Sequence, residues 1–154
     1  MIGKLTNEEI EEVLHSNVLG RIGCNDGKKT YVVPLNYVYD GRQIIANSTE
    51  GMKIRIMRKN PSICFEVDEM KSFTNWKSVI ALGQYQELTE ERDRYYAMKL
   101  FLDKMMHTKI SRTAALAGIP ENKEYLQTGV TIKPVIFRLL LFEKTGRFEN
   151  DELP

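Results

Sequence analysis

The segment from Asn47 to Lys53 combines residue types that could bind a phosphate group. Asn47, Ser48 and Thr49 supply polar side chains, and Gly51 and Lys53 follow where the pattern MKIRIMRKN predicts the start of a helix. Free backbone N–H groups at a helix N-terminus, hydroxyl groups and a lysine ammonium together favour an anion. The segment lacks the glycine spacing of a dinucleotide-binding or P-loop motif. These residues therefore predict a phosphorylated ligand beside a β-sheet.

Two β-rich runs, residues 31–39 and 44–47, precede this segment and must position it. They are joined at Asp40-Gly41, a dipeptide that suits the positive φ angles of a hairpin turn. Pro34 interrupts the first run. Because proline cannot donate a ladder hydrogen bond, it predicts an edge strand, a bulge or a place where the sheet opens.

The rest of the chain is predicted to be mainly β, with helices at its periphery. A capping box at Thr6 begins a short amphipathic helix that ends near His15, and a long helix follows Thr89 and ends near His107. Helical spacing also predicts a short helix over residues 52–59. Further strands are predicted at 18–24, 62–67, 78–88 and from 130 onwards. About six strands without regular βαβ alternation favour an antiparallel barrel over a doubly wound sheet.

We expect residues 1–154 to form a single domain. Its predicted parts are an N-terminal helix (1–17), a barrel core (18–88), a helical segment (89–129), a final strand (130–146) and a frayed tail (147–154). The stretch 108–129 is broken by glycine and proline, and its residues assign it no role.

Composition excludes several classes of function. The 154 residues carry a formal net charge of +1, with 28% charged and 42% apolar residues, so no global field attracts nucleic acid or an anionic membrane. No apolar run approaches the roughly 18 residues of a membrane span. The N-terminal residues are acidic and helical rather than of signal-peptide type, so a cytoplasmic location is expected.

No metal site is predicted. Cys24 and Cys64 fall in predicted strands without CxxC or Cys/His spacing, and small buried thiols are the simplest interpretation. His15 and His107 lie far apart in sequence and form no metal-binding motif.

An ordered series of motifs resembles a known family. The series GRIG, VVPLNYVYDG, NSTEGMKIRIMRKNPSICFEVDE and WKSVIALGQYQEL resembles the flavin-binding split-barrel proteins related to pyridoxamine 5′-phosphate oxidase. Within that superfamily the chain is most similar to the branch of nitroimidazole-resistance (Nim) reductases. The resemblance covers residues 19–88 closely and the final strand loosely. It implies an antiparallel split β-barrel that binds FMN and forms a homodimer, with two flavin sites at the subunit interface.

The resemblance also implies three groups of cofactor-binding residues. The first lies along the flavin and offers backbone groups to the isoalloxazine edge: Val33, Pro34, Leu35, Asn36 and Tyr37. The second forms the ribityl and phosphate pocket: Asn47, Ser48, Thr49, Gly51, Met52 and Lys53. The third enters the next strand, with Lys77 as a second phosphate cation and Ser78 as a hydroxyl donor: Trp76, Lys77 and Ser78.

Each of these assignments has a simpler alternative. Lys53 could be one solvated cation of a basic helix, Trp76 a core or interface anchor, and Asn36 a partner of a neighbouring strand. In the nitroimidazole-resistance branch the position of Asn47 is commonly a histidine. Asparagine neither titrates near neutrality nor acts as a nucleophile, so no catalytic residue is assigned.

Three functions remain open from the sequence. The first is an FMN-dependent oxidoreductase that passes electrons from a reduced nicotinamide to a small acceptor such as a nitro compound or a quinone. The second is a non-catalytic flavin carrier or sensor, and the third is a barrel that has lost its cofactor. The prediction that the cofactor is FMN, and not haem or a deazaflavin, rests on the resemblance alone. Oxidation of pyridoxamine phosphate itself is not expected, because residues 147–150 lack the basic C-terminus of the oxidase proper.

Overall fold

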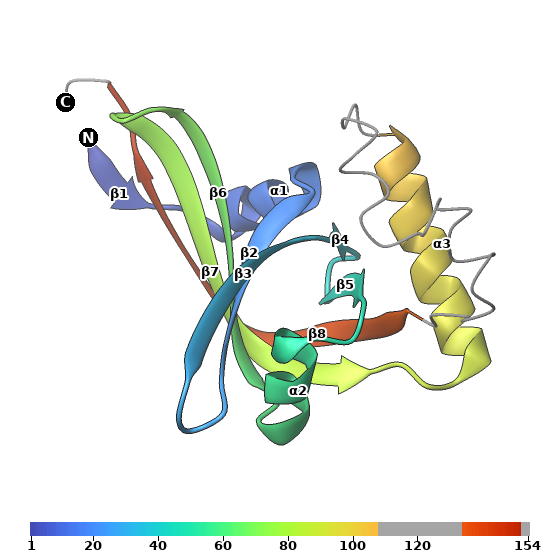
Figure 1. Cartoon of the computed structure of the whole chain (residues 1–154). Coiled ribbons are helices and arrows are strands. Elements are labelled where there is room, and N and C mark those ends of the chain that lie inside the picture. Colours follow the sequence, from blue (N-terminus) through green and yellow to red (C-terminus); the bar gives the residue numbers. More distant parts are fainter. Residues whose placement is uncertain (108–133, 152–154) are drawn as a thin grey trace.

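The computed structural model describes residues 1–107 and 134–151, and this part of the chain forms one curved sheet with helices around it (Figure 1). Its elements, in chain order, are β1 (Ile2–Lys4), α1 (Asn7–Ser16), β2 (Leu19–Asn25), β3 (Thr30–Asn36), β4 (Val38–Tyr39), β5 (Gln43–Ser48), α2 (Met52–Lys59), β6 (Ser62–Ser72), β7 (Asn75–Glu87), α3 (Glu91–His107) and β8 (Val135–Glu149).

Antiparallel pairing links all the strands into an open barrel. The order is β3-β2-β6-β7-β8-β5-β4, and β1 pairs with β8 outside this path. Strands β3 and β4 lie at the two ends of this order and do not pair with each other, so the sheet curves round without closing. The predicted antiparallel split barrel with peripheral helices is confirmed, but the described residues hold eight strands rather than about six.

The interior of the curved sheet is the main hydrophobic core. Its largest fully buried side chains include Tyr37, Phe65 and Phe137, and α1 and α2 add apolar residues such as Leu14 and Ile54. A second, smaller cluster lies on the opposite face of β5, where Ile45 packs in the same cluster as Ala97 and Phe101 of α3. Strand β5 is therefore covered on both faces, which fixes the position of the loop that follows it.

Local signals predicted the turns and caps correctly. Thr6 caps α1 through a complete capping box with Glu9. Gly41 has a φ of +97° in the turn between β4 and β5, as the Asp40-Gly41 dipeptide predicts. Pro34 lies in β3, the edge strand of the sheet, which agrees with its missing hydrogen-bond donor.

Several predicted boundaries were wrong. The run 31–39 is two strands, because the chain leaves β3 after Asn36 and the Tyr37 amide donates instead to the Val18 carbonyl at 2.9 Å. The acidic residues Asp68 and Glu69 belong to β6 rather than to a connection. Their carboxylates have partners across the sheet surface, since Arg21 donates to Asp68 at 2.8 Å and Asn17 to Glu69 at 2.8 Å.

Both ends of the chain also differ from the prediction. Residues 1–17 begin with the short strand β1 before the helix, and the supposed tail from Arg147 continues β8 as far as Glu149. The reason is pairing between distant segments: Ile2 and Trp76 both align with Glu149. The start of the final strand at residue 130 and the segment 108–129 lie outside the described residues.

We predict that Tyr37→Phe destabilises the fold by about 1–2 kcal/mol. The Tyr37 side chain is fully buried, and its hydroxyl donates to the Leu14 carbonyl at 2.8 Å in the last turn of α1. The substitution leaves that carbonyl without this donor, at a helix end where carbonyls lack intrahelical partners. Urea unfolding measures the loss. Tyr95→Phe, at a side chain that is 73% exposed, serves as the control and should change stability by less than about 0.5 kcal/mol.

Candidate functional site

The loop between β5 and α2 presents the N-terminus of a helix without a side-chain cap. Asn47 and Ser48 end β5, and α2 begins at Met52 after the extended N-cap residue Gly51. No side chain caps the helix, and its first turn contains no acidic residue. The first backbone N–H groups of a helix have no intrahelical acceptor, so this end carries a partial positive charge that favours an anion.

Lys53 lies in this first turn as an unneutralised, half-buried cation. No hydrogen bond or ion pair joins its ammonium to another residue in the described part of the chain. Burial lowers the pKa of Lys53 and outweighs the opposing effect of the Cys24 side chain. A lysine that loses water without gaining a carboxylate is costly unless a ligand supplies the negative charge.

Asn47 adds a second unsatisfied polar group at the same loop. Both its amide nitrogen and its amide oxygen are buried, and neither has a hydrogen-bond partner among the described residues. Buried side-chain amides nearly always have partners, because an unpaired one loses its hydration without compensation. The side chain thus offers one donor group and one acceptor to a ligand.

The acidic residue of the loop is turned away from Lys53. Arg58, in the last turn of α2, donates to both carboxylate oxygens of Glu50 at 2.9 and 2.7 Å. It also binds Glu87 at 3.0 and 2.7 Å. Arg58 is consequently neutralised by two acids, and Glu50 is unavailable to neutralise Lys53. Sequence reasoning missed this arrangement, since Glu87 is distant along the chain and only the fold brings it to α2.

The first predicted group, on β3 and the residue that follows it, divides between the core and the surface. Leu35 and Tyr37 are buried in the core, whereas Pro34 is exposed and Val33 and Asn36 are half-buried. Their side chains cannot all face one ligand. The backbone is better placed for the predicted role, because β3 lies at the edge of the sheet that the described strands form.

The third predicted group lies at the far end of the sheet. Trp76 donates to Glu149 at 2.9 Å, Ser78 donates to Glu66 at 3.2 Å, and Lys77 is half-buried. In Figure 1 the hairpin of β6 and β7 reaches away from α2.

The register of the strands measures this separation. Cys24 of β2 lies near enough to Lys53 to influence its pKa, and Cys24 pairs with Ile63 of β6. Lys77 pairs with Glu69, farther along the same strand β6. At about 3.3 Å per residue, these two pairs are roughly 20 Å apart. One chain therefore places Asn47, Ser48, Thr49, Gly51, Met52 and Lys53 in one continuous segment, from the end of β5 to the first turn of α2, but does not bring Lys77 to Lys53.

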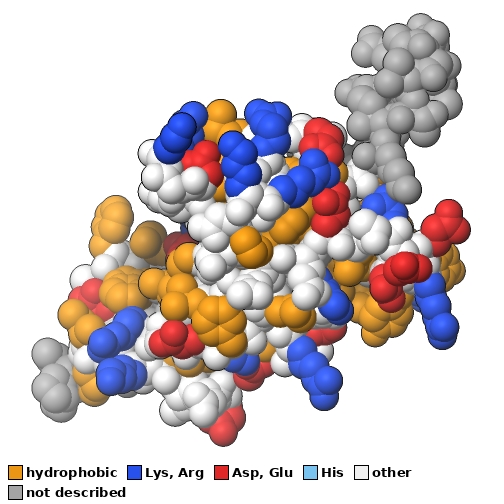
Figure 2. All heavy atoms as spheres, turned by 90° about the horizontal axis from the view of Figure 1, so that it is seen from below, with side chains coloured by type: hydrophobic (Ala, Val, Ile, Leu, Met, Phe, Trp, Pro, Cys, Tyr) orange, Lys and Arg blue, Asp and Glu red, His pale blue; other side chains and the backbone are white. Residues whose placement is uncertain are grey.

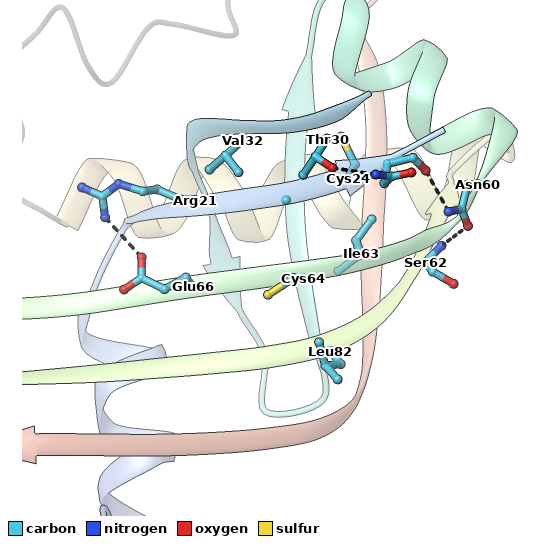
Figure 3. Close-up of a pocket in the computed structure, with 12 residues that line it drawn as sticks. Arg21, Cys24, Thr30, Val32, Asn60, Ser62, Ile63, Cys64, Glu66 and Leu82 are labelled. Atoms are coloured by element: carbon cyan, nitrogen blue, oxygen red, sulfur yellow. Dashed lines mark hydrogen bonds and ion pairs between the residues drawn. The ribbon is translucent and has the colours of Figure 1, made fainter. Parts of the chain in front are cut away.

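A groove of about 580 Å³ lies on the outer face of β2, β6 and β7 (Figure 3). Val32 and Leu82, which line it, are 61% and 37% exposed, and the ion pair between Arg21 and Glu66 lies at one end. Leu19 and Ile80 are also exposed. None of the predicted cofactor residues lines this groove. An exposed apolar sheet face of this kind is typical of a surface that contacts another protein.

The described residues contain neither a candidate metal site nor a membrane-spanning helix. No group of three or more His, Cys, Asp or Glu side chains could hold a metal ion there. Cys24 and Cys64 are both free thiols. None of the helices described, including α3, combines the length and the apolar character needed to cross a membrane.

Comparison with known proteins identifies the family. A family model described as pyridoxamine 5′-phosphate oxidase matches residues 6–136, most of the chain. The chain belongs to the pyridoxamine 5′-phosphate oxidase family. A curated relative, an uncharacterised protein of Rhizobium meliloti (strain 1021), is 36% identical over 84 residues, which is 54% of this chain and 56% of the relative. The aligned part thus spans just over half the length of that relative.

Solved structures of the family share the fold. An FAD-binding protein from Mesorhizobium loti has a TM-score of 0.72 and 28% identity, with 97% of this chain and 99% of that chain covered. A Bacteroides thetaiotaomicron protein described as a 5-nitroimidazole antibiotic resistance protein has a TM-score of 0.69, but only 16% identity, over 99% of this chain and 92% of that one. The first of these proteins is described as binding FAD, and the likeness to the second shows the fold alone.

The β5–α2 loop fits the phosphate end of a flavin. A flavin phosphate needs a cation and N–H donors, and its ribityl chain needs polar partners. The described residues offer groups of these kinds: Lys53, which has no counter-ion among them, the uncapped start of α2, and the Asn47 amide, which has no partner among them.

Proposed function

We propose that this protein binds FMN and uses it as an oxidoreductase, passing electrons from a reduced nicotinamide to a small acceptor such as a nitro compound or a quinone. The observation that carries the proposal is Lys53, a half-buried cation with no anionic partner among the described residues, at an uncapped helix N-terminus. Membership of the family and the FAD-binding relative from Mesorhizobium loti support a flavin as the ligand.

In this proposal the chain supplies binding and orientation. Lys53 and the first N–H groups of α2 hold the phosphate, with Ser48 and Thr49 beside them. The Asn47 amide orients the flavin, and the backbone of the edge strand β3 offers further donors and acceptors. When bound, the flavin supplies the electron-transfer chemistry, while the protein sets its position and surroundings.

The proposed site needs two chains, which we propose to form a homodimer. Lys77 lies roughly 20 Å from Lys53 along the sheet, so the two cations can meet at one phosphate only if they come from different subunits. Two surface features support such a contact. Leu19, Val32 and Ile80 are exposed on the outer sheet face, and Phe73, in the turn between β6 and β7, is 90% exposed.

An absorbance spectrum tests flavin binding directly. Purified protein is measured before and after FMN is added and the excess is removed. The proposal predicts flavin bands at about one FMN per chain. If the protein shows no flavin bands before or after FMN is added, the oxidoreductase proposal is contradicted, and a barrel that has lost its cofactor is the function that remains.

Mixed dimers test whether the site is shared between subunits. Lys53→Ala and Lys77→Ala dimers should each bind FMN weakly, because each carries the same defect in both sites. A heterodimer of the two variants would contain one site with both substitutions and one intact site. Mixing and reannealing the variants should therefore restore tight binding to a fraction of the sites. No restoration, despite heterodimers detected by mass spectrometry, would contradict a site that takes one lysine from each chain.

A second candidate function is a flavin carrier or sensor without turnover. Asn47 favours it, because an amide cannot donate or accept a proton in the way that an imidazole can. Steady-state oxidation of NADH and NADPH with nitro compounds and quinones separates the two functions. Rates well above those of free FMN support the oxidoreductase, and rates equal to free FMN support the carrier.

The buried position of Lys53 also predicts a pH dependence of FMN affinity. Burial lowers the pKa of Lys53 in the unliganded protein, so its charge is present at low pH and is lost as pH rises through this lowered value. Above about pH 7 the phosphate is already a dianion. FMN affinity should therefore fall at a pH where exposed lysines are still charged. In Lys53→Arg, whose guanidinium stays protonated, affinity should remain level across the same range.

A further inference from the structure

A small cleft lined by basic side chains lies next to the proposed phosphate site. It has a volume of about 270 Å³ and separates the turn after β2 from the exposed face of α2. Its lining residues are Asp26, Lys29, Met52, Arg55, Ile56 and Lys59. Figure 2 shows this underside of the molecule, where several Lys and Arg side chains gather along the upper edge with Asp and Glu side chains beside them.

Three cations face one carboxylate in this cleft. Lys29, Arg55 and Lys59 form no ion pair within the described ranges. The carboxylate of Asp26 is already engaged by the turn, since its Oδ1 atom accepts the backbone N–H groups of Lys28 at 3.0 Å and Lys29 at 2.8 Å. The cleft is thus left with an excess of positive charge.

The contrast with Arg58 makes this excess informative. Arg58 lies on the same helix and is bound by two carboxylates. Arg55 and Lys59 lie within the same eight-residue helix but form no ion pair with any residue in the part of the chain that the structure describes. Like charges gathered around a concavity repel one another, and an anion bound between them would relieve the repulsion.

The position and size of the cleft restrict its occupant. Met52, which lines it, immediately precedes Lys53, so the cleft adjoins the proposed flavin phosphate site; Lys53 itself is not part of the lining. The volume lies below the roughly 300–1,000 Å³ of a site for a whole drug-sized ligand. A phosphate on a ribose is of suitable size, whereas a complete dinucleotide is not.

We propose that this cleft binds a phosphate group of a nucleotide, as a second anion site beside that of the flavin phosphate. This inference extends the proposed function and rests on it. Two ligands of a flavin-dependent oxidoreductase carry such a phosphate group. One is the adenylate end of a dinucleotide flavin, and the other is the 2′-phosphate end of a reduced nicotinamide donor.

Titration with 2′-AMP and ADP tests the cleft without relying on any activity. The wild-type protein, saturated with FMN or free of it, should bind at least one of these probes. Arg55→Ala/Lys59→Ala should weaken that binding by at least about tenfold, because it removes two charge-assisted contacts. Lys28→Ala is the matched control, since Lys28 lies in the same turn but does not line the cleft, and it should bind the probe as the wild type does.

Cofactor titrations then identify the source. If Arg55→Ala/Lys59→Ala has a higher KM for NADPH than the wild type and the same KM for NADH, the cleft binds the 2′-phosphate of the nicotinamide donor. If the same variant binds FAD more weakly than the wild type and FMN equally well, the cleft binds the adenylate end of a dinucleotide flavin. Unchanged FMN affinity in the double variant also shows that the fold and the Lys53 site are intact, so failure here is distinct from failure of flavin binding.

Two results would overturn the proposal. One is a wild-type protein that binds neither 2′-AMP nor ADP at low ionic strength, where surface charges act most strongly. The other is an Arg55→Ala/Lys59→Ala variant that binds 2′-AMP, ADP, NADPH, NADH, FAD and FMN as the wild type does. The milder Arg55→Gln/Lys59→Gln variant should then give the same result.

Discussion

Lys53→Ala is expected to bind FMN about 10- to 100-fold more weakly than the wild-type protein. Lys53 is the half-buried cation beside the uncapped start of α2, and no described acidic residue neutralises it. A charge-assisted contact to a dianionic phosphate is worth about 1.5–3 kcal/mol, which corresponds to this range. Quenching of flavin fluorescence during titration gives the dissociation constants.

Two comparisons make this result specific to the site. Lys99→Ala removes a positive charge from an exposed position on α3 and should leave FMN affinity within about twofold. Riboflavin, which lacks the phosphate, should bind Lys53→Ala and the wild type with similar affinity. Equal FMN affinity in Lys53→Ala and the wild type would contradict the proposal that the flavin phosphate binds at this loop.

The second large effect is expected at Gly83, where a side chain has no room. A Cβ atom there would lie 2.3 Å from the Leu140 carbonyl oxygen and 3.0 Å from its carbon. These are backbone atoms of β8, so the clash cannot be relieved by rotation of a side chain. The position also adjoins the register shift between Leu82 and Gly83, on the seam where β7 pairs with β8. Gly83→Ala should destabilise the fold by about 2–4 kcal/mol.

Gly23→Ala provides the matched control for this prediction. Gly23 also lies in a strand of the same sheet, but a Cβ atom there would meet its nearest neighbour, Cys64, at an ordinary 3.7 Å. Its stability should change by less than about 0.5 kcal/mol. Both variants are unfolded with urea at the same protein concentration, because a dimer would make stability depend on concentration. Similar stability of the two variants would contradict the proposed clash.

The sequence predicted features that depend on neighbouring residues. Asp40-Gly41 predicted its turn, because the positive φ angle is a local requirement of a hairpin. Thr6 and Glu9 predicted the cap of α1 for the same kind of reason. The sequence also placed Asn47 at the end of a strand and Lys53 at the start of the next helix, as the bounds of β5 and α2 show, whereas their common role in a ligand site stays a prediction.

Features that depend on pairing between distant segments could not be predicted in this way. Asp68 and Glu69 resembled a polar connection, but Arg21 and Asn17 provide their partners across the surface, which allows β6 to continue. The end of β8 resembled a frayed tail until its pairing with β1 and Trp76 was known. The separation of Lys53 from Lys77 likewise depends on strand register, which the order of motifs does not contain.

The placement of β8 has a consequence for the kinetics of folding. Strand β5, which ends in the proposed ligand loop, is joined to the body of the sheet only through β8, because its other described strand partner is the two-residue β4. Asn47 pairs with Ile136, so a very long loop must close before β5 is anchored. Pairings of such high contact order form slowly. Ligand binding should therefore develop with the last refolding phase, after the β2–β3 and β6–β7 hairpins have formed.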